Sequence, residues 1–110
     1  MNLIIGSHVS YNNKSQLLGS VKEALSYKAN TFMFYTGAPQ NTNRSVIEDS
    51  LTMEAYKLMK ENNIALEKVI VHAPYIVNLA NFNNFDFSVS FLINEVERCR
   101  TLGIKYLVLH

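Results

Sequence analysis

The chain has 110 residues, of which 48% are hydrophobic and 17% are charged, and this composition is typical of a folded globular domain. Its formal net charge of +1 excludes a strongly basic or acidic protein, although a local charged face stays open. The single cysteine, Cys99, excludes an internal disulfide bond and indicates a reducing compartment. No apolar run approaches the about 20 residues of a membrane span. We therefore expect a cytoplasmic protein with no membrane partner.

Four short apolar runs predict four β-strands. They lie at residues 3–5, 31–35, 69–71 and 106–109. None of them alternates polar with apolar residues, as a strand with one wet face would. We therefore expect parallel strands that are covered on both faces.

Two helices are predicted between the first three strands. Residues 15–27 place apolar side chains on one face at intervals of three and four. A second helix is predicted to begin at Ser45, because Glu48 follows three residues later and the pair forms a capping box. Asn62 and Asn63 should end that helix.

A third helix is predicted over residues 86–102. Its periodicity predicts that Phe87, Phe91, Val96 and either Leu92 or Ile93 face inward. Gly103 should end it as the residue after the C-cap. Cys99 lies on this helix and should pack as a small hydrophobic side chain.

Strands and helices alternate through three βαβ units, which predicts an α/β fold. The fourth strand has no helix after it, and an apolar strand left uncovered is unfavourable. The pattern fits the first half of a (β/α)8 TIM barrel, because a complete barrel needs about 250 residues. We expect one partial domain over residues 1–110, with four parallel strands alternating with three helices and truncation after the fourth strand.

Each of the three histidines, His8, His72 and His110, follows one of the predicted strands. The carboxyl ends of parallel strands lie on one face of such a fold, where ligands bind. A single histidine there is often only a structural residue, but His72 and His110 together suit Zn²⁺ or another borderline metal. His8 is a candidate for a supporting hydrogen bond to a ligand, with direct binding of the metal as the alternative.

A divalent ion also needs carboxylates, and none is predicted at a strand end. The acidic residues expected on helix or loop surfaces are Glu48, Asp49, Glu54, Glu61, Glu67, Asp86, Glu95 and Glu97. The remaining metal ligands would then lie beyond residue 110.

Two loops carry side chains that suit a nucleic acid. After the second strand, Gln40 and Asn41 offer amides for base edges and sugars, and Arg44 offers a guanidinium for phosphate. After the third strand, Tyr75 and Ile76 could enter a base stack as a wedge. The alternatives are an ordinary polar loop in the first case, and side chains folded back onto the barrel in the second.

Four segments together resemble the endonuclease IV family of apurinic/apyrimidinic-site endonucleases. They are IIGSHVS, NTFMFYTGAPQNT, VHAPYIVNLAN and LGIKYLVLH, in this order from one end of the chain to the other. The resemblance extends over the amino-terminal third to half of a family member. It implies a zinc-dependent (β/α)8 barrel that acts in base excision repair and is monomeric at full length.

The resemblance also implies roles for particular residues. His72 and His110 match two ligands of one zinc in a three-zinc cluster, with Mn²⁺ or Fe²⁺ as alternative metals. Gln40 and Asn41 match a loop that probes the minor groove, and Tyr75 and Ile76 match a pair inserted at the lesion. The expected reaction is hydrolysis of the phosphodiester bond 5′ to an abasic site in duplex DNA, where the metals supply the hydroxide nucleophile. The later metal ligands are absent, so we expect the 110 residues alone to be inactive.

Two other interpretations of the rim histidines stay open. One is a metal-dependent sugar isomerase or epimerase with a similar barrel, although such a site would favour Lys, Trp or carboxylates and the chain has no Trp. The other is a non-catalytic remnant that binds DNA or nothing.

Overall fold

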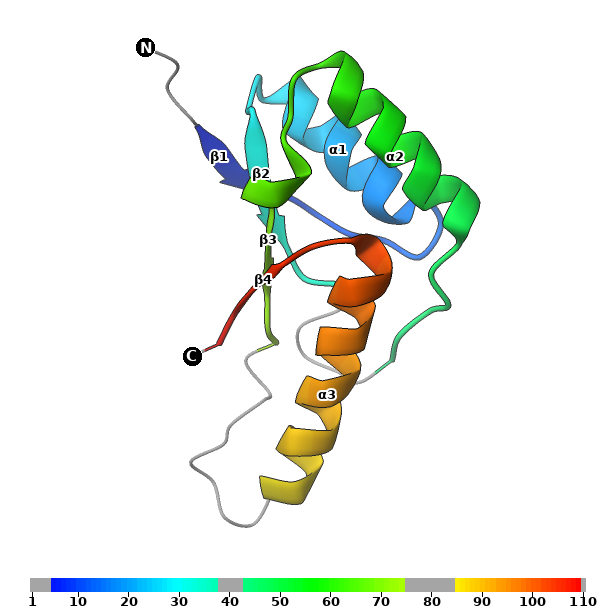
Figure 1. Ribbon diagram of the computed structural model, residues 1–110, viewed down its shortest axis with the longest axis vertical. Helices are drawn as coiled ribbons and strands as arrows, with labels where there is room; N and C mark the ends of the chain where they lie inside the picture. The colour runs from blue at the N-terminus through cyan, green and yellow to red at the C-terminus, as the bar shows by residue number, and fades with distance from the viewer. Residues whose placement is uncertain (1–4, 38–42, 75–84, 110) are drawn as a thin grey trace.

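The structure, a computed structural model, describes residues 5–37, 43–74 and 85–109. Figure 1 shows the four strands and the three helices in the alternating order that the sequence predicts. In chain order the elements are β1 (Gly6–His8), α1 (Gln16–Ser26), β2 (Thr31–Phe34), α2 (Asp49–Glu61), a short 3₁₀ helix (Leu66–Lys68), β3 (Ile70–His72), α3 (Phe85–Leu102) and β4 (Tyr106–Val108).

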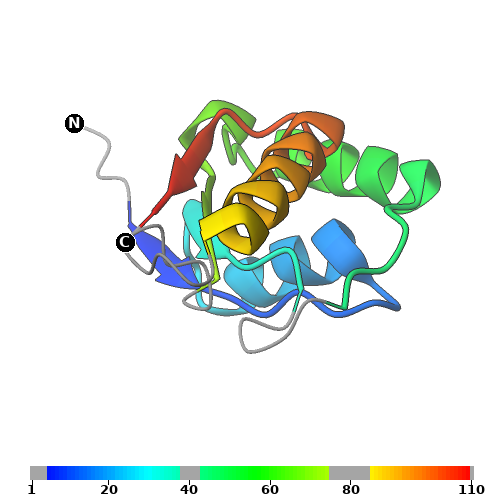
Figure 2. The same cartoon turned by 90° about the horizontal axis from the view of Figure 1, so that it is seen from below.

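The strands form one parallel sheet in the order β1-β2-β3-β4. His8 pairs with Met33 of β2, and His72 of β3 pairs with Val108 of β4. All three helices lie on the same side of this sheet (Figures 1 and 2). Right-handed crossovers between neighbouring parallel strands give this arrangement in a barrel.

The two faces of the sheet differ in burial. Phe32, Phe34 and Val71 point toward the helices and are 0–2% exposed. Residues on the opposite side, which we call the open face, are more exposed, and Tyr106 is 57% exposed. The prediction that both faces are covered is therefore wrong for the part of the chain that the structure describes, where helices cover one face only.

Two strands begin later than predicted. β1 covers Gly6–His8, because Asn30 takes both backbone groups of Ile5: its side chain accepts from the Ile5 amide, and its own amide donates to the Ile5 carbonyl. The pairing with β2 then starts at Gly6. β3 covers Ile70–His72. His8 and His72 are thus the last residues of β1 and β3, whereas the prediction placed both after their strands.

The predicted capping box at Ser45 does not form. α2 begins at Asp49, and the backbone amide of Glu48 donates to the side-chain oxygen of Gln16 at 2.9 Å. The Gln16 amide nitrogen also donates to the Val46 carbonyl at 2.8 Å. The buried Gln16 thereby holds the segment before α2 extended, and so it removes the need for a serine cap.

The inward face of α3 is more polar than predicted. Phe91 is buried, but Phe87, Ile93 and Val96 are 46–58% exposed. The buried positions are Ser88, Phe91, Glu95, Arg98, Cys99 and Leu102. The predicted end of the helix is confirmed, because Gly103 has φ +76°. Among the described helices, none has the length and apolarity to cross a membrane.

Candidate metal and nucleic-acid site

Three aromatic rings form a row at the carboxyl ends of neighbouring strands. The Tyr35 ring, which directly follows β2, lies 5.1 Å from the His8 ring and 5.0 Å from the His72 ring, measured between centroids. Both pairs are tilted by just over 50°, within the range of ordinary aromatic contacts. The sheet therefore brings two of the three histidines to one edge of the open face, with Tyr35 in contact with both.

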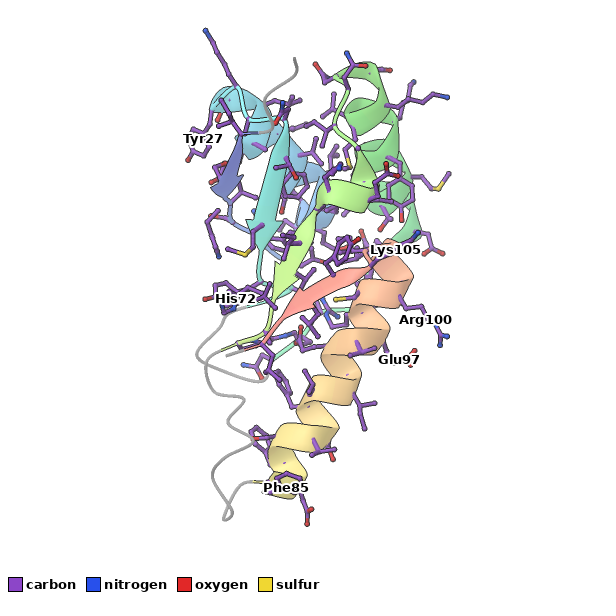
Figure 3. The ribbon with its side chains drawn as sticks, turned by 60° about the vertical axis from the view of Figure 1, so that its left-hand side comes forward. Tyr27, His72, Phe85, Glu97, Arg100 and Lys105 are labelled. Carbon is purple, nitrogen blue, oxygen red and sulfur yellow. The ribbon has the colours of Figure 1, made fainter. Side chains whose placement is uncertain are left out.

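The position of His72 suits a metal ligand. It is 8% exposed, and Figure 3 shows its side chain at the end of β3, pointing away from α3. The Nδ1 atom lies 2.6 Å from the carbonyl oxygen of Ala73. A carbonyl only accepts, so Nδ1 carries the proton and the lone pair of the neutral ring is on Nε2. Histidine ligands of zinc commonly have this arrangement.

His8 and His72 lie on strands that are not neighbours. β2 separates β1 from β3, so the two strand axes are about twice 4.8 Å apart. His8 pairs with Met33 of β2. Val71 pairs with Phe34, the last residue of β2, so His72 lies beyond the end of that strand. The two histidines are linked through the Tyr35 ring, and this arrangement is consistent with an indirect role for His8.

Several predicted site residues lie outside the described part of the chain. They are Gln40, Asn41, Tyr75, Ile76 and His110. Over residues 5–37, 43–74 and 85–109, no group of three His, Cys, Asp or Glu side chains could hold a metal. Of the three histidines, only His8 and His72 lie in the part of the chain that the structure describes.

A buried carboxylate connects the two ends of the loop between β2 and α2. Glu95 of α3 is 0% exposed, which corrects its prediction as a surface residue. Its Oε2 accepts from the Thr36 hydroxyl at 2.6 Å, and its Oε1 lies 2.7 Å from Nε of Arg44. Thr36 precedes the loop and Arg44 follows it. A buried charge of this kind is stable only with such partners.

Arg98 contacts the same two places from the next turn of α3. Its Nη2 donates to the Thr36 carbonyl at 2.9 Å, and its Nη1 donates to the Ser45 carbonyl at 2.6 Å. Its Nε also donates to the Thr36 hydroxyl at 3.1 Å. Arg98 thus joins both ends of the loop to α3 through two backbone carbonyls and the Thr36 hydroxyl.

The Arg44 guanidinium is buried and not available on the surface. Its side chain is 5% exposed, and its Cζ lies 4.9 Å from the centre of the Phe91 ring, a cation–π contact. A Cβ at Gly37 would lie 2.7 Å from Cδ of Arg44. Position 37 therefore requires glycine, because Arg44 crosses directly over its backbone. The expectation that Arg44 binds phosphate from the loop surface is not supported.

Burial also changes the acidity of two groups near this network. It raises the pKa of Cys99 to about 11, mainly by desolvation and further by the Glu95 carboxylate. Burial also raises the pKa of Tyr11, which stacks on Phe34, and Arg98 partly opposes this effect. Cys99 lies in the hydrophobic core, as predicted, and its raised pKa favours the protonated thiol at neutral pH.

The sequence analysis missed Tyr35, Glu95 and Arg98. Tyr35 could have been found from its place directly after a strand, by the argument that selected the histidines. Glu95 and Arg98 are three residues apart, and with Phe91 they lie on one face of the helix at intervals of four and three. That spacing could have revealed a shared face, but not its burial.

The chain is similar in sequence to proteins described as "Probable endonuclease 4". It is 51% identical to that of Mesoplasma florum over 97% of its own length and 39% of the relative's, and 54% identical to that of Bacillus subtilis strain 168 over 98% and 37%. The chain thus spans well under half the length of the curated relatives it matches. No protein-family model matches the chain.

The fold is similar to that of a solved nuclease. The structure matches the crystal structure of endonuclease IV from Thermus thermophilus with a TM-score of 0.80 and 26% sequence identity. The match covers 96% of this chain and 39% of that one. The four parallel strands with their helices therefore correspond to part of a TIM barrel, as the sequence predicts.

Proposed function

We propose that the chain is part of a metal-dependent DNA-repair enzyme of the endonuclease IV family, because it is similar to curated relatives and to a solved structure with that name. The proposed reaction is hydrolysis of the phosphodiester bond on the 5′ side of an abasic site in duplex DNA. The observation that carries the proposal is His72, an imidazole with its proton held on Nδ1, at the carboxyl end of a strand in a sheet of this family. This edge is where TIM barrels place their active sites.

Zinc is the proposed metal, and His72 and His110 are its proposed ligands in this chain. His72 lies opposite Val108, the last residue of β4. His110 comes two residues later in the sequence and lies outside the described residues. A bound zinc would polarise the phosphate and lower the pKa of a bound water.

The DNA contacts of the proposal come from two loops. Gln40 and Asn41 would probe the minor groove, and Tyr75 and Ile76 would fill the space at the lesion. An abasic nucleotide has no base to unstack, so moving it out of the helix costs less than moving an intact one. The anchoring of the first loop at Thr36 and Arg44 supports a role that needs a fixed loop.

A chimera tests the reaction directly. This sequence would replace the matching segment of the Bacillus subtilis relative, of which it spans 37%. The substrate is a 5′-labelled duplex with one tetrahydrofuran abasic analogue, and an intact duplex is the control. We expect zinc-dependent incision of the abasic duplex only, with a product that a DNA polymerase extends from its 3′ hydroxyl.

The unaltered relative is the positive control. If the relative incises the abasic duplex and the chimera does not, although it is folded, this sequence does not support the reaction. Equal incision of both duplexes would contradict abasic-site specificity. The 110-residue chain alone should give no incision.

A further inference from the structure

Two ends of one loop meet at one side chain in this molecule. In the loop between β2 and α2, Thr36 and Arg44 lie on either side of residues 37–43, and the two oxygens of Glu95 bind one of them each. Both oxygens of this fully buried carboxylate thus bind residues at the two ends of the same loop. We propose that Glu95 and Arg98 are positioning residues for DNA recognition, which hold the ends of the loop that carries Gln40 and Asn41.

The geometry favours positioning over a purely structural ion pair. A hydrophobic pair of similar size would fill a core position as well as a buried salt bridge does, and often better. Glu95 and Arg98 instead contact the chain on both sides of the loop: Arg98 binds the Thr36 and Ser45 carbonyls, and Glu95 binds the Thr36 hydroxyl and Arg44. Apolar side chains could not fix these backbone groups.

Gly37 provides a second, independent sign of a closed loop base. A Cβ there would lie 2.7 Å from Arg44, and Arg44 is held by Glu95 on one side and by the Phe91 ring on another. The first residue after Thr36 and the last before Ser45 are therefore in contact. Contact between the two ends of a loop reduces the conformational entropy that is lost when the protein binds DNA. Pre-organisation of this kind increases affinity.

The inference depends on the proposed function, because it assigns DNA recognition to the loop. Its key variant is Glu95→Gln, which keeps the shape of the side chain but removes the charge that binds Arg44. Glu97→Gln is the matched control, since Glu97 is on the same helix, is exposed and only approaches Arg100 at 3.7 Å (Figure 3). In the chimera, we expect Glu95→Gln to raise KM for the abasic duplex about tenfold, with kcat changed less than about twofold.

A structural measurement on the 110-residue chain separates the two proposals. Hydrogen exchange over residues 35–45 should be about tenfold faster in Glu95→Gln than in the wild type, and Glu97→Gln should leave it unchanged. If the unaltered chimera incises DNA but Glu95→Gln has wild-type KM, the positioning role is wrong and the proposed function stands. If no chimera incises DNA, the proposed function fails. Unchanged hydrogen exchange in Glu95→Gln would separately show that Glu95 does not hold the ends of the loop.

A second variant covers the case in which Glu95→Gln does not fold. Thr36→Val keeps the volume and removes only the hydroxyl that donates to Glu95 and accepts from Arg98. Like Glu95→Gln, this variant should raise KM and speed hydrogen exchange over residues 35–45, but both effects should be smaller. A folded Thr36→Val chain with wild-type KM and wild-type exchange would overturn the proposal.

Discussion

The Tyr35 and His72 rings are in contact at the carboxyl ends of neighbouring strands, with their centroids 5.0 Å apart. The contact covers one side of the imidazole and leaves its hydrogen bond to the Ala73 carbonyl in place. A ring held on two sides keeps the same orientation whether or not a ligand is present. This is the arrangement that makes His72 the first residue to test.

His72→Ala should remove metal from the chimera. We expect the affinity for zinc to fall by at least about a hundredfold, since loss of a residue that merely orients a ligand already costs 10–100-fold. Zinc per chain, measured by elemental analysis after dialysis, is the readout. His8→Ala is the control and should keep most of its zinc; full zinc in His72→Ala would reject the assignment.

Tyr75→Ala should affect DNA and not metal. Tyr75 lies outside the described residues, so this prediction depends on the sequence alone. Removing the ring should lower the preference for abasic over intact duplex about tenfold, because stacking of an aromatic on a base contributes about 1–3 kcal/mol. Fluorescence anisotropy at a fixed salt concentration measures the preference, and zinc content should be unchanged. Loss of zinc with an unchanged preference would contradict the assigned role.

Glu95→Ala should destabilise the chain far more than Glu97→Ala. The first variant leaves the buried Arg44 without its carboxylate partner, which costs about 3–5 kcal/mol for a buried pair. The second removes an exposed ion pair that contributes about 0–1 kcal/mol. Urea denaturation followed by circular dichroism measures both. Similar midpoints for the two variants would show that the buried network does not stabilise the fold.

Gly103→Ala should also destabilise the chain, by more than about 1 kcal/mol, because alanine is strained at a positive φ. Gly103 has φ +76°, and a Cβ there would lie 2.6 Å from the Tyr56 hydroxyl. That hydroxyl donates to the Leu102 carbonyl at the end of α3. The double variant Gly103→Ala/Tyr56→Phe should recover part of the loss. No difference between Gly103→Ala and the wild type in urea would contradict this account.

Cys99 should react slowly with iodoacetamide in the folded chain. With its pKa raised from 9.0 to about 11, the thiolate fraction at pH 8 is about a hundred times lower than in the unfolded chain. Because the folded pKa is the higher one, the thiol favours folding below pH 9, and this contribution is lost between pH 9 and 11. Labelling followed by mass spectrometry, with and without urea, measures the difference; equal rates would show that Cys99 is accessible.

The sequence predicted the elements well because apolar periodicity decides where helices and strands form. It placed β2, α1 and α3 to within one residue at each end. It failed at Ser45 and at Glu95, and for the same reason in both cases. The deciding partners, Gln16 for the start of α2 and Arg44 for Glu95, lie more than thirty residues away in the chain, where local spacing carries no information.

The site was predicted less completely than the fold. The rule that parallel strands end at one edge selected His8 and His72, and the structure brings both to Tyr35. Burial of a charged helix face could not be foreseen, since a glutamate on a helix is normally exposed. The metal and DNA roles of the remaining predicted residues stay predictions.

The bonds from Thr36 to Glu95 and Arg98 cross 59 and 62 residues of the chain. Contacts so distant in sequence form late, because most of the intervening chain must first be ordered. During synthesis on the ribosome, the segment after β2 therefore leaves the exit tunnel well before the helix that fixes its ends. Thr36 and Arg44 gain their contacts with Glu95 only when α3 docks, so substitutions that delay this docking should lengthen the interval in which the nascent chain is open to proteases.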